Sequence, residues 1–108
     1  MSIVFECRDF EGRRVRLGLN GWRHILAKRP WLHEHRSKIM EAVEEPDLVL
    51  EGGFGELLAI KWFEDLLDGI YLVVVYRPLN GEGFIITAYP TKKVERLRRR
   101  RRLVWRKP

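Results

Sequence analysis

Two apolar runs joined by a short polar turn dominate the second half of the chain. Residues 70–76 and 84–89 are rich in β-branched and aromatic side chains, and Asn80-Gly81 lies between them. Runs of this kind around an Asn-Gly pair are typical of a β-hairpin. If side chains alternate strictly between the two faces, one face of the second strand carries Ile85, Thr87 and Tyr89. The pattern therefore predicts a core hairpin with two hydroxyl groups on one face.

The first half of the chain combines a β pattern with a helical one. Residues 3–7 and 13–19 alternate apolar and polar side chains, which predicts a first hairpin. Residues 22–26 have the spacing of a buried helix face. Because a proline disfavours helical backbone at the residue before it, we expect this helix to end at Arg29-Pro30 and a second helix to run from Trp31 toward Pro46.

Two further strands are expected before the hairpin, at residues 48–50 and 57–64. Helices that are segregated from consecutive antiparallel strands indicate an α+β fold, here two helices packed on one face of an antiparallel sheet. The length of 108 residues suits a single core, which we place at residues 1–95. Residues 96–108 are expected to form a basic C-terminal tail. The apolar residues Val94 and Leu97, with Leu103, Val104 and Trp105, can lie back on the sheet.

A glycine-rich segment, Gly52-Gly53-Phe54-Gly55, separates the two middle strands. It has no following Lys-Thr and precedes a strand, whereas a phosphate-binding loop precedes a helix. We therefore expect a flexible loop there.

Charge is distributed very unevenly along the chain. The formal net charge is +6, but residues 1–90 carry −3 and residues 91–108 carry +9. The basic run contains Arg96, Arg98, Arg99, Arg100, Arg101 and Arg102. Such a run attracts polyanions, and RNA is the partner we expect, although an arginine block can also be a solvated terminus or bind an acidic protein.

Other features narrow the class of protein. No apolar run reaches the length of a membrane span and the N-terminus lacks the pattern of a signal peptide, so we expect a cytoplasmic protein without a membrane partner. The single cysteine, Cys7, lies on an expected strand and is interpreted as a buried apolar residue. His24, His33 and His35 have no metal-ligand spacing, and we expect no metal and no cofactor.

The remaining polar residues suit metal-free cleavage of RNA. The 2′-OH of RNA can act as the nucleophile, so a protein has to supply proton transfer and charge stabilisation around the phosphate. His24 is a candidate acid or base, Lys61 and Arg77 are candidate cations, and Thr87 and Tyr89 are candidate hydroxyl donors. Arg29 and the six tail arginines are candidates for nucleic-acid binding.

The arrangement of several short motifs resembles a known nuclease superfamily. The motifs are Trp22-x-His24-Ile25, the Pro-started second helix, Pro46-Asp47, Val73-Val74-Val75 and Ile85-Ile86-Thr87-Ala88-Tyr89. In this order they resemble the phage and toxin branch of the barnase, EndoU, colicin and RelE nucleases. The resemblance implies two helices before a four-stranded antiparallel sheet, a helix histidine matching His24, and a late-strand site matching Thr87 and Tyr89. The resemblance also implies that Lys61 and Arg77 are the strand cations of the site. Arg29 stands where the pattern of the superfamily has a histidine.

Three functions are compatible with these residues. The first is a metal-independent, toxin-like or mobile-element-associated endoribonuclease, whose partners would include RNA and an antitoxin or immunity protein. The second is a non-catalytic nucleic-acid-binding domain with Tyr71, Tyr76 and Tyr89 as its platform, which the replacement of histidine by Arg29 favours. The third is a protein-interaction module that binds an acidic partner through the tail.

Overall fold

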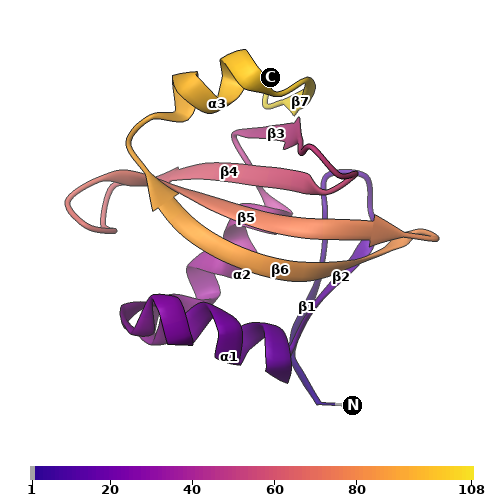
Figure 1. Ribbon diagram of the computed structural model, residues 1–108, viewed down its shortest axis with the longest axis vertical. Coiled ribbons are helices and arrows are strands. Elements are labelled where there is room, and N and C mark those ends of the chain that lie inside the picture. The colour runs from indigo at the N-terminus through magenta and orange to yellow at the C-terminus, as the bar shows by residue number, and fades with distance from the viewer. Residues whose placement is uncertain (1) are drawn as a thin grey trace.

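The computed structural model describes residues 2–108 and shows an α+β fold built on one twisted sheet (Figure 1). Seven strands form the sheet: β1 (Ile3–Arg8), β2 (Arg14–Gly18), β3 (Leu48–Glu51), β4 (Leu57–Phe63), β5 (Ile70–Leu79), β6 (Glu82–Thr91) and β7 (Leu103–Arg106). The helical elements are α1 (Leu19–Lys28), the 3-10 helix η1 (Pro30–His35), α2 (Arg36–Glu44) and α3 (Val94–Arg100). Within residues 2–108, no helix has the length and apolarity needed to cross a membrane.

The sheet is mixed, which corrects the expected antiparallel sheet. Its strand order is β1-β2-β6-β5-β4-β3-β7. The β1–β2 hairpin joins the free edge of β6, and residues 14–16 of β2 pair in parallel with residues 82–84 of β6. The other strand pairs are antiparallel, so the middle of the sheet is the expected meander of β3 to β6. Non-local pairing of this kind leaves no periodic signal in a single sequence.

The first two helical segments cover one face of the sheet. Trp22 and Ile25 of α1, Leu32 of η1, and Ile39 and Val43 of α2 are buried against it. The first helix was expected in this position. The expected second helix is divided, since residues 30–35 form a 3-10 helix that begins at Pro30 and only residues 36–44 are α-helical.

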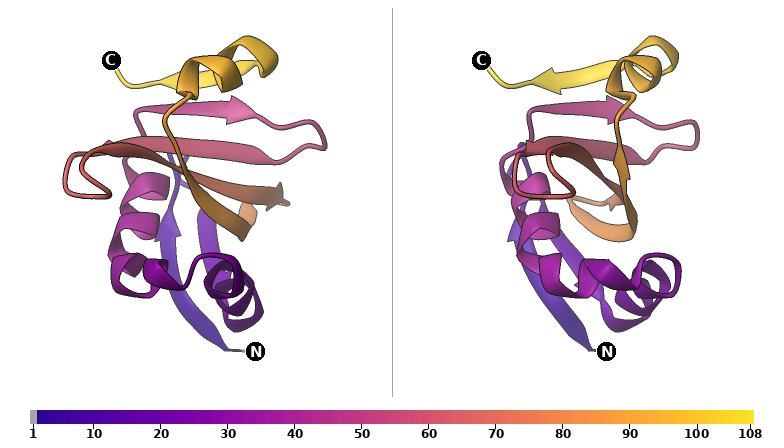
Figure 2. Two further views of the ribbon diagram at one scale, coloured as in Figure 1. Left: turned by 60° about the vertical axis from the view of Figure 1, so that its left-hand side comes forward. Right: turned by 90° about the vertical axis from the view of Figure 1, so that its left-hand side faces the viewer.

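Residues 94–106 cover part of the opposite face, so the segment expected to be a basic tail is an integral part of the fold. Val94 and Leu97 of α3 pack against Leu50, Ile60 and Val73. Strand β7 then pairs antiparallel with β3 and completes the sheet edge (Figure 2). The boundary expected at residue 95 therefore lies inside α3, because apolar positions 94 and 97 are spaced as one face of a helix.

The central hairpin is confirmed, with one change of register. Asn80 and Gly81 have φ values of 53° and 80°, as the two central residues of a tight β-hairpin turn require. A β-bulge lies opposite the Val75–Tyr76 bond, because Val75 pairs with Thr87 and Tyr76 pairs with Ile85. Ile85 is therefore buried on the helix-covered face, and the expectation that it shares a face with Thr87 and Tyr89 is wrong.

A buried carboxylate ties the β1–β2 turn to the sheet. The side chain of Asp9 is fully buried and accepts hydrogen bonds from the Arg13 guanidinium at 2.6 Å and from the Tyr76 hydroxyl at 2.9 Å. It also accepts the backbone N–H groups of Glu11 and Arg13, at 3.0 and 2.8 Å. Burial and the Asp9 carboxylate together raise the pKa of Tyr76, which therefore remains a hydrogen-bond donor.

Candidate nucleic-acid interface

The half of the second sheet face that α3 leaves open carries a tyrosine close to two arginines. Thr87 and Tyr89 of β6 lie on this face, because they pair with Val75 and Val73 and not with the helix-covered positions. The Arg29 guanidinium carbon lies 5.8 Å from the centre of the Tyr89 ring, in a cation–π arrangement. Figure 1 shows β6 running between α1 and α3, the two helices whose ends carry these arginines.

Both arginines occupy the first position after a helix. Arg29 follows α1 and donates its backbone N–H to Ile25, and Pro30 then forces the chain out of the helix. Arg101 follows α3 and donates its backbone N–H to Leu97. A helix C-terminus carries partial negative charge and favours a cation nearby. Each of the two helices thus ends on a cation, of which Arg29 lies against Tyr89 of β6 and Arg101 against Gly53 of the β3–β4 loop.

The pKa of the Tyr89 phenol reflects its burial and two nearby positive charges. Burial raises the pKa of the Tyr89 phenol, and the positive charges of Arg101 and Arg29 offset part of this rise. The hydroxyl therefore stays protonated at neutral pH and can donate a hydrogen bond. A protonated phenol with a guanidinium group against its ring and a second positive charge acting on it offers donors suited to an anionic oxygen such as that of a phosphate.

Arg29 and Arg101 have no acidic partner among residues 2–108, whose ion pairs include neither of them. Arg77, in contrast, donates to the carbonyl oxygen of Phe54 at 2.9 Å and lies 3.8 Å from the Glu56 carboxylate. Its charge is thus partly used to hold the loop between β3 and β4.

The arginines in residues 96–102, the segment expected to be a tail, include some that form ion pairs and some that face solvent. Arg98 pairs with Glu95, and Arg102 with Glu51, both at 3.2 Å. Arg96, Arg99 and Arg100 instead surround a shallow hollow of about 290 Å³ on the exposed side of α3. These three side chains form a basic ridge next to the open sheet face.

Lys61 does not join the other candidate residues. It pairs with Leu72 on the helix-covered face, where its ammonium group donates to the carbonyl oxygen of Glu45 at 2.9 Å and lies 4.0 Å from the carboxylates of Glu41 and Asp47. Thr87 lies on the opposite face of the sheet. The position of Lys61 therefore indicates a structural cation that binds α2 and its following turn to β4.

The three histidines also differ in their surroundings. His33 stacks on Trp22 with 6.3 Å between ring centres, and His35 meets Trp31 edge to face at 6.1 Å. His24 is exposed on α1. No hydrogen bond or ion pair within the described residues connects His24 to Thr87 or Tyr89.

Of the three tyrosines expected to form an aromatic platform, Tyr76 lies on the other face of the sheet. Tyr76 is fully buried on the helix-covered face, where it binds Asp9. Tyr71 packs edge to face on Trp62, with 5.1 Å between ring centres. Tyr71 shares a face with Tyr89, because it pairs with Thr91 while Val73 pairs with Tyr89, but the arginine contact is made by Tyr89.

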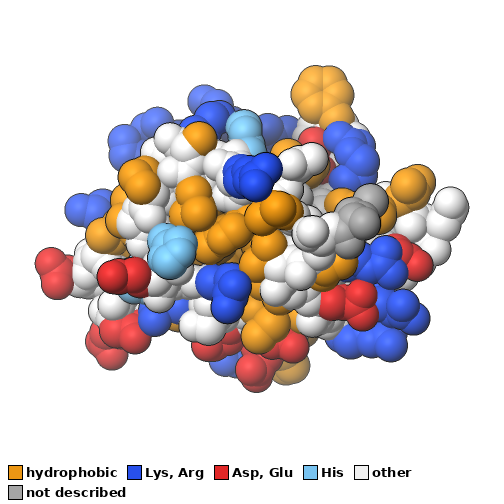
Figure 3. Space-filling model, turned by 90° about the horizontal axis from the view of Figure 1, so that it is seen from below, with side chains coloured by type: hydrophobic (Ala, Val, Ile, Leu, Met, Phe, Trp, Pro, Cys, Tyr) orange, Lys and Arg blue, Asp and Glu red, His pale blue; other side chains and the backbone are white. Residues whose placement is uncertain are grey.

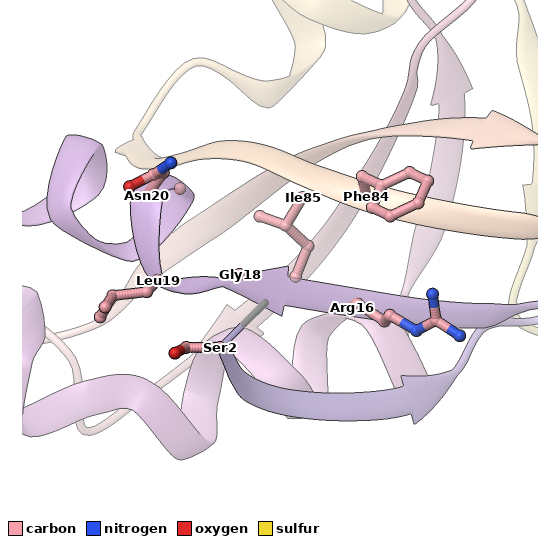
Figure 4. A pocket seen from close by; sticks show the side chains of 8 residues that line it. Ser2, Arg16, Gly18, Leu19, Asn20, Phe84 and Ile85 are labelled. Carbon is pink, nitrogen blue, oxygen red and sulfur yellow. The ribbon is translucent and has the colours of Figure 1, made fainter.

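A cavity of about 440 Å³ lies elsewhere, where β2 diverges from β6 at the start of α1 (Figure 4). Leu19, Phe84 and Ile85 form much of its wall, and the charge of Arg16 is taken up by Glu6 and Glu82 at 3.0 Å. Figure 3 shows apolar side chains gathered in the middle of the face that α1 occupies. This cavity lacks the unpaired cations that distinguish the open face.

Among residues 2–108, no three His, Cys, Asp or Glu side chains are grouped as ligands of a metal ion. Comparison with known proteins found no matching family model, no matching curated protein and no matching solved structure.

Proposed function

We propose that this protein binds RNA across the open sheet face and cleaves it without a metal ion. The observation that supports the proposal is the position of Tyr89, whose protonated hydroxyl lies near Arg29 and Arg101 while neither arginine has an acidic partner among the described residues. Cations without carboxylate partners attract phosphate groups, and binding to a polyanion releases counterions.

The proposed reaction uses the nucleophile that RNA already contains. The 2′-oxygen attacks the adjacent phosphorus and loses its proton to a base, while the bond from phosphorus to the 5′-oxygen breaks and that oxygen receives a proton. The products are a 2′,3′-cyclic phosphate and a 5′-hydroxyl. Arg29 and Arg101 stabilise the charge that develops on the phosphate oxygens, which is the kind of contribution that preorganised donors make in enzymes.

Proton transfer is assigned to Tyr89 and His24. The Tyr89 phenol, which its environment keeps protonated, is positioned to donate to a phosphate or leaving oxygen. His24 supplies the base once RNA brings its own 2′-OH near α1, since histidine is the side chain that exchanges protons near neutral pH. Thr87 is a second hydroxyl donor beside Tyr89, and Arg77 acts by holding the neighbouring loop.

A second candidate is a binding domain that does not cleave. It is favoured by His24, which is exposed on α1 and which no hydrogen bond within the described residues joins to Thr87 or Tyr89. In that function the same two arginines and Tyr89 hold the phosphate, and no proton is transferred.

Incubation of a labelled RNA with the pure protein in EDTA separates the two candidates. We expect cleavage to persist in EDTA and to yield 2′,3′-cyclic phosphate ends, and DNA of the same sequence to remain intact because it lacks the 2′-OH. Tyr89→Phe and His24→Ala should each lower the rate by about 10²-fold or more without a change in melting temperature. Loss of cleavage in EDTA, or equal cleavage of DNA, contradicts the mechanism, and binding without cleavage assigns the protein to the second candidate.

A further inference from the structure

The loop between β3 and β4 presents one aromatic ring to solvent. Phe54 is 84% exposed, whereas the other large apolar residues on the surface are between 38% and 56% exposed. A single exposed apolar residue is common and needs no explanation by itself. Phe54 differs from the rest because its backbone is fixed and its neighbours are arginines.

Three hydrogen bonds fix the loop, which corrects the expectation of a flexible segment. The Phe54 N–H donates to the Glu56 carboxylate at 2.8 Å, and its carbonyl oxygen accepts from Arg77 at 2.9 Å. The Gly52 N–H donates to the Glu56 carbonyl oxygen at 2.7 Å, and a Cβ on Gly52 would overlap the Glu56 carboxylate. The loop is thus folded around Glu56 and braced by Arg77, with the aromatic ring directed outward.

The loop also touches the arginine that acts on Tyr89. A Cβ on Gly53 would lie 3.0 Å from Nη1 of Arg101, so the guanidinium group packs closely over this glycine. Arg101 therefore lies against the residue that precedes Phe54, and Arg77 binds the carbonyl oxygen of Phe54 itself. The exposed ring thus has one arginine on each side of it in the loop, and the positive charge of Arg101 also reaches Tyr89, which Arg29 contacts.

This arrangement matches the requirements of an unpaired nucleotide. Proteins that bind single-stranded nucleic acids combine aromatic rings, on which bases stack, with cations that hold the backbone. Because the backbone of Phe54 is already fixed, stacking of a base on the ring does not have to order the loop as well. In a duplex, by contrast, the base faces are already stacked on their neighbours and are not accessible.

We propose that Phe54 is a stacking platform for an unpaired base and that the substrate bound at the open face is single-stranded RNA. This inference rests on the proposed RNA binding and adds the class of RNA. In this arrangement a base stacks on Phe54 while Arg101 and Arg29 hold phosphate groups on the side toward Tyr89.

The test compares the binding of two labelled probes, a short 2′-O-methyl RNA of mixed sequence and the blunt duplex formed with its complement. The 2′-O-methyl groups block cleavage by the proposed mechanism, so fluorescence anisotropy reports binding alone. The proteins compared are the wild type, Phe54→Ala, Phe54→Tyr and, as a matched control, Leu79→Ala, which truncates an exposed apolar side chain in the β5–β6 hairpin.

We expect Phe54→Ala to weaken binding of the single strand about tenfold and binding of the duplex little, because stacking on an aromatic side chain contributes on this scale. Phe54→Tyr, which keeps the ring, should bind as the wild type does, and so should Leu79→Ala. Equal effects of Phe54→Ala and Leu79→Ala on the single strand overturn the inference, as does an equal loss on both probes.

Failure of this inference can be distinguished from failure of the proposed function. If Tyr89→Phe weakens binding while Phe54→Ala does not, the open face binds RNA and Phe54 has no part in it. If the wild-type protein binds neither probe, both proposals are wrong. Melting temperatures of the four proteins show whether each is folded, and an exposed residue such as Phe54 should leave that temperature unchanged.

Discussion

The charged side chains on the two faces of the sheet differ in whether other protein groups pair with them. On the face covered by α1, η1 and α2, the ammonium group of Lys61 is satisfied by the Glu45 carbonyl oxygen and lies between two carboxylates, and the Asp9 carboxylate accepts four hydrogen bonds. On the opposite face, Arg29 and Arg101 act on Tyr89 and take part in none of the ion pairs within residues 2–108.

The difference separates structural charges from charges available to a ligand. Burying an ion is costly unless protein groups compensate it, so the charges of the covered face are enclosed by partners. A cation at an open face is solvated and needs no such partner. Residue type alone does not distinguish the two cases, since Lys61 and Arg29 are equally plausible candidates in the sequence.

The largest effect expected from this comparison is on stability, at Asp9. Asp9→Ala leaves the buried Tyr76 hydroxyl and the Arg13 guanidinium without their acceptor, and we expect a loss of about 3 kcal/mol in the free energy of unfolding. Urea denaturation measures it. Tyr76→Phe, which removes one hydrogen bond and leaves the others, should cost about 1 kcal/mol. An Asp9→Ala loss no larger than that of Tyr76→Phe would show that the network is not what holds the turn.

A smaller effect is expected from Cys7, which is buried on the same face. Burial raises the pKa of the Cys7 thiol from an ordinary value of 9.0 to about 12, and the charge of Glu44 adds to this rise. Because the folded pKa is the higher one, the stability that the protonated thiol contributes is fully present below pH 9 and is lost as the pH rises from 9 toward 12.

Between pH 9 and pH 10, the free energy of unfolding of the wild type should therefore fall by about 1 kcal/mol more than that of Cys7→Ala. Urea denaturation of both proteins in a reducing buffer at pH 9 and pH 10 measures the difference. The same comparison at pH 7, where the thiol is protonated in both states, gives the effect of removing the side chain itself. Parallel curves for the two proteins would mean that the thiol is accessible to solvent.

Local patterns were sufficient to predict the central hairpin and the first helix. The β-branched run at 70–76 and the Asn80-Gly81 turn correspond to the observed β5–β6 pair, and the spacing of Trp22 and Ile25 corresponds to α1. These elements are determined by residues that are neighbours in the sequence, and periodicity detects such relations.

Features that depend on distant residues were not predictable in the same way. The bulge that buries Ile85 depends on its pairing with Tyr76, and the parallel pairing of β2 with β6 depends on how the first hairpin docks. Val94 and Leu97 were expected to lie on the sheet, and they do, but the arginine run around them gave no indication that they belong to a helix. The pairing of β7 with β3 depends on residues more than 50 positions apart, which local spacing does not reveal.

The residues of the candidate site could be predicted, but which of them lie close together could not. Arg29, Thr87, Tyr89 and Arg101 were all singled out, but the contact between Arg29 and Tyr89 depends on where α1 ends relative to β6. Phe54 was assigned to a flexible loop because the hydrogen bonds to Glu56 and Arg77 that fix it cannot be inferred from the glycines around it.

The most direct test of the central claim compares two double variants that remove the same charge. Arg29→Gln/Arg101→Gln removes the cations beside Tyr89, and Arg96→Gln/Arg99→Gln removes two cations from the exposed ridge of α3. Binding of a single-stranded 2′-O-methyl RNA is measured by anisotropy for both variants at the same salt concentration, because electrostatic binding depends strongly on salt. We predict that the first variant binds at least about tenfold more weakly than the second, since hydrogen bonds to a charged group contribute about 1.5–3 kcal/mol each. Equal affinities would show that RNA responds only to the net charge of the molecule and would contradict a phosphate site at Tyr89.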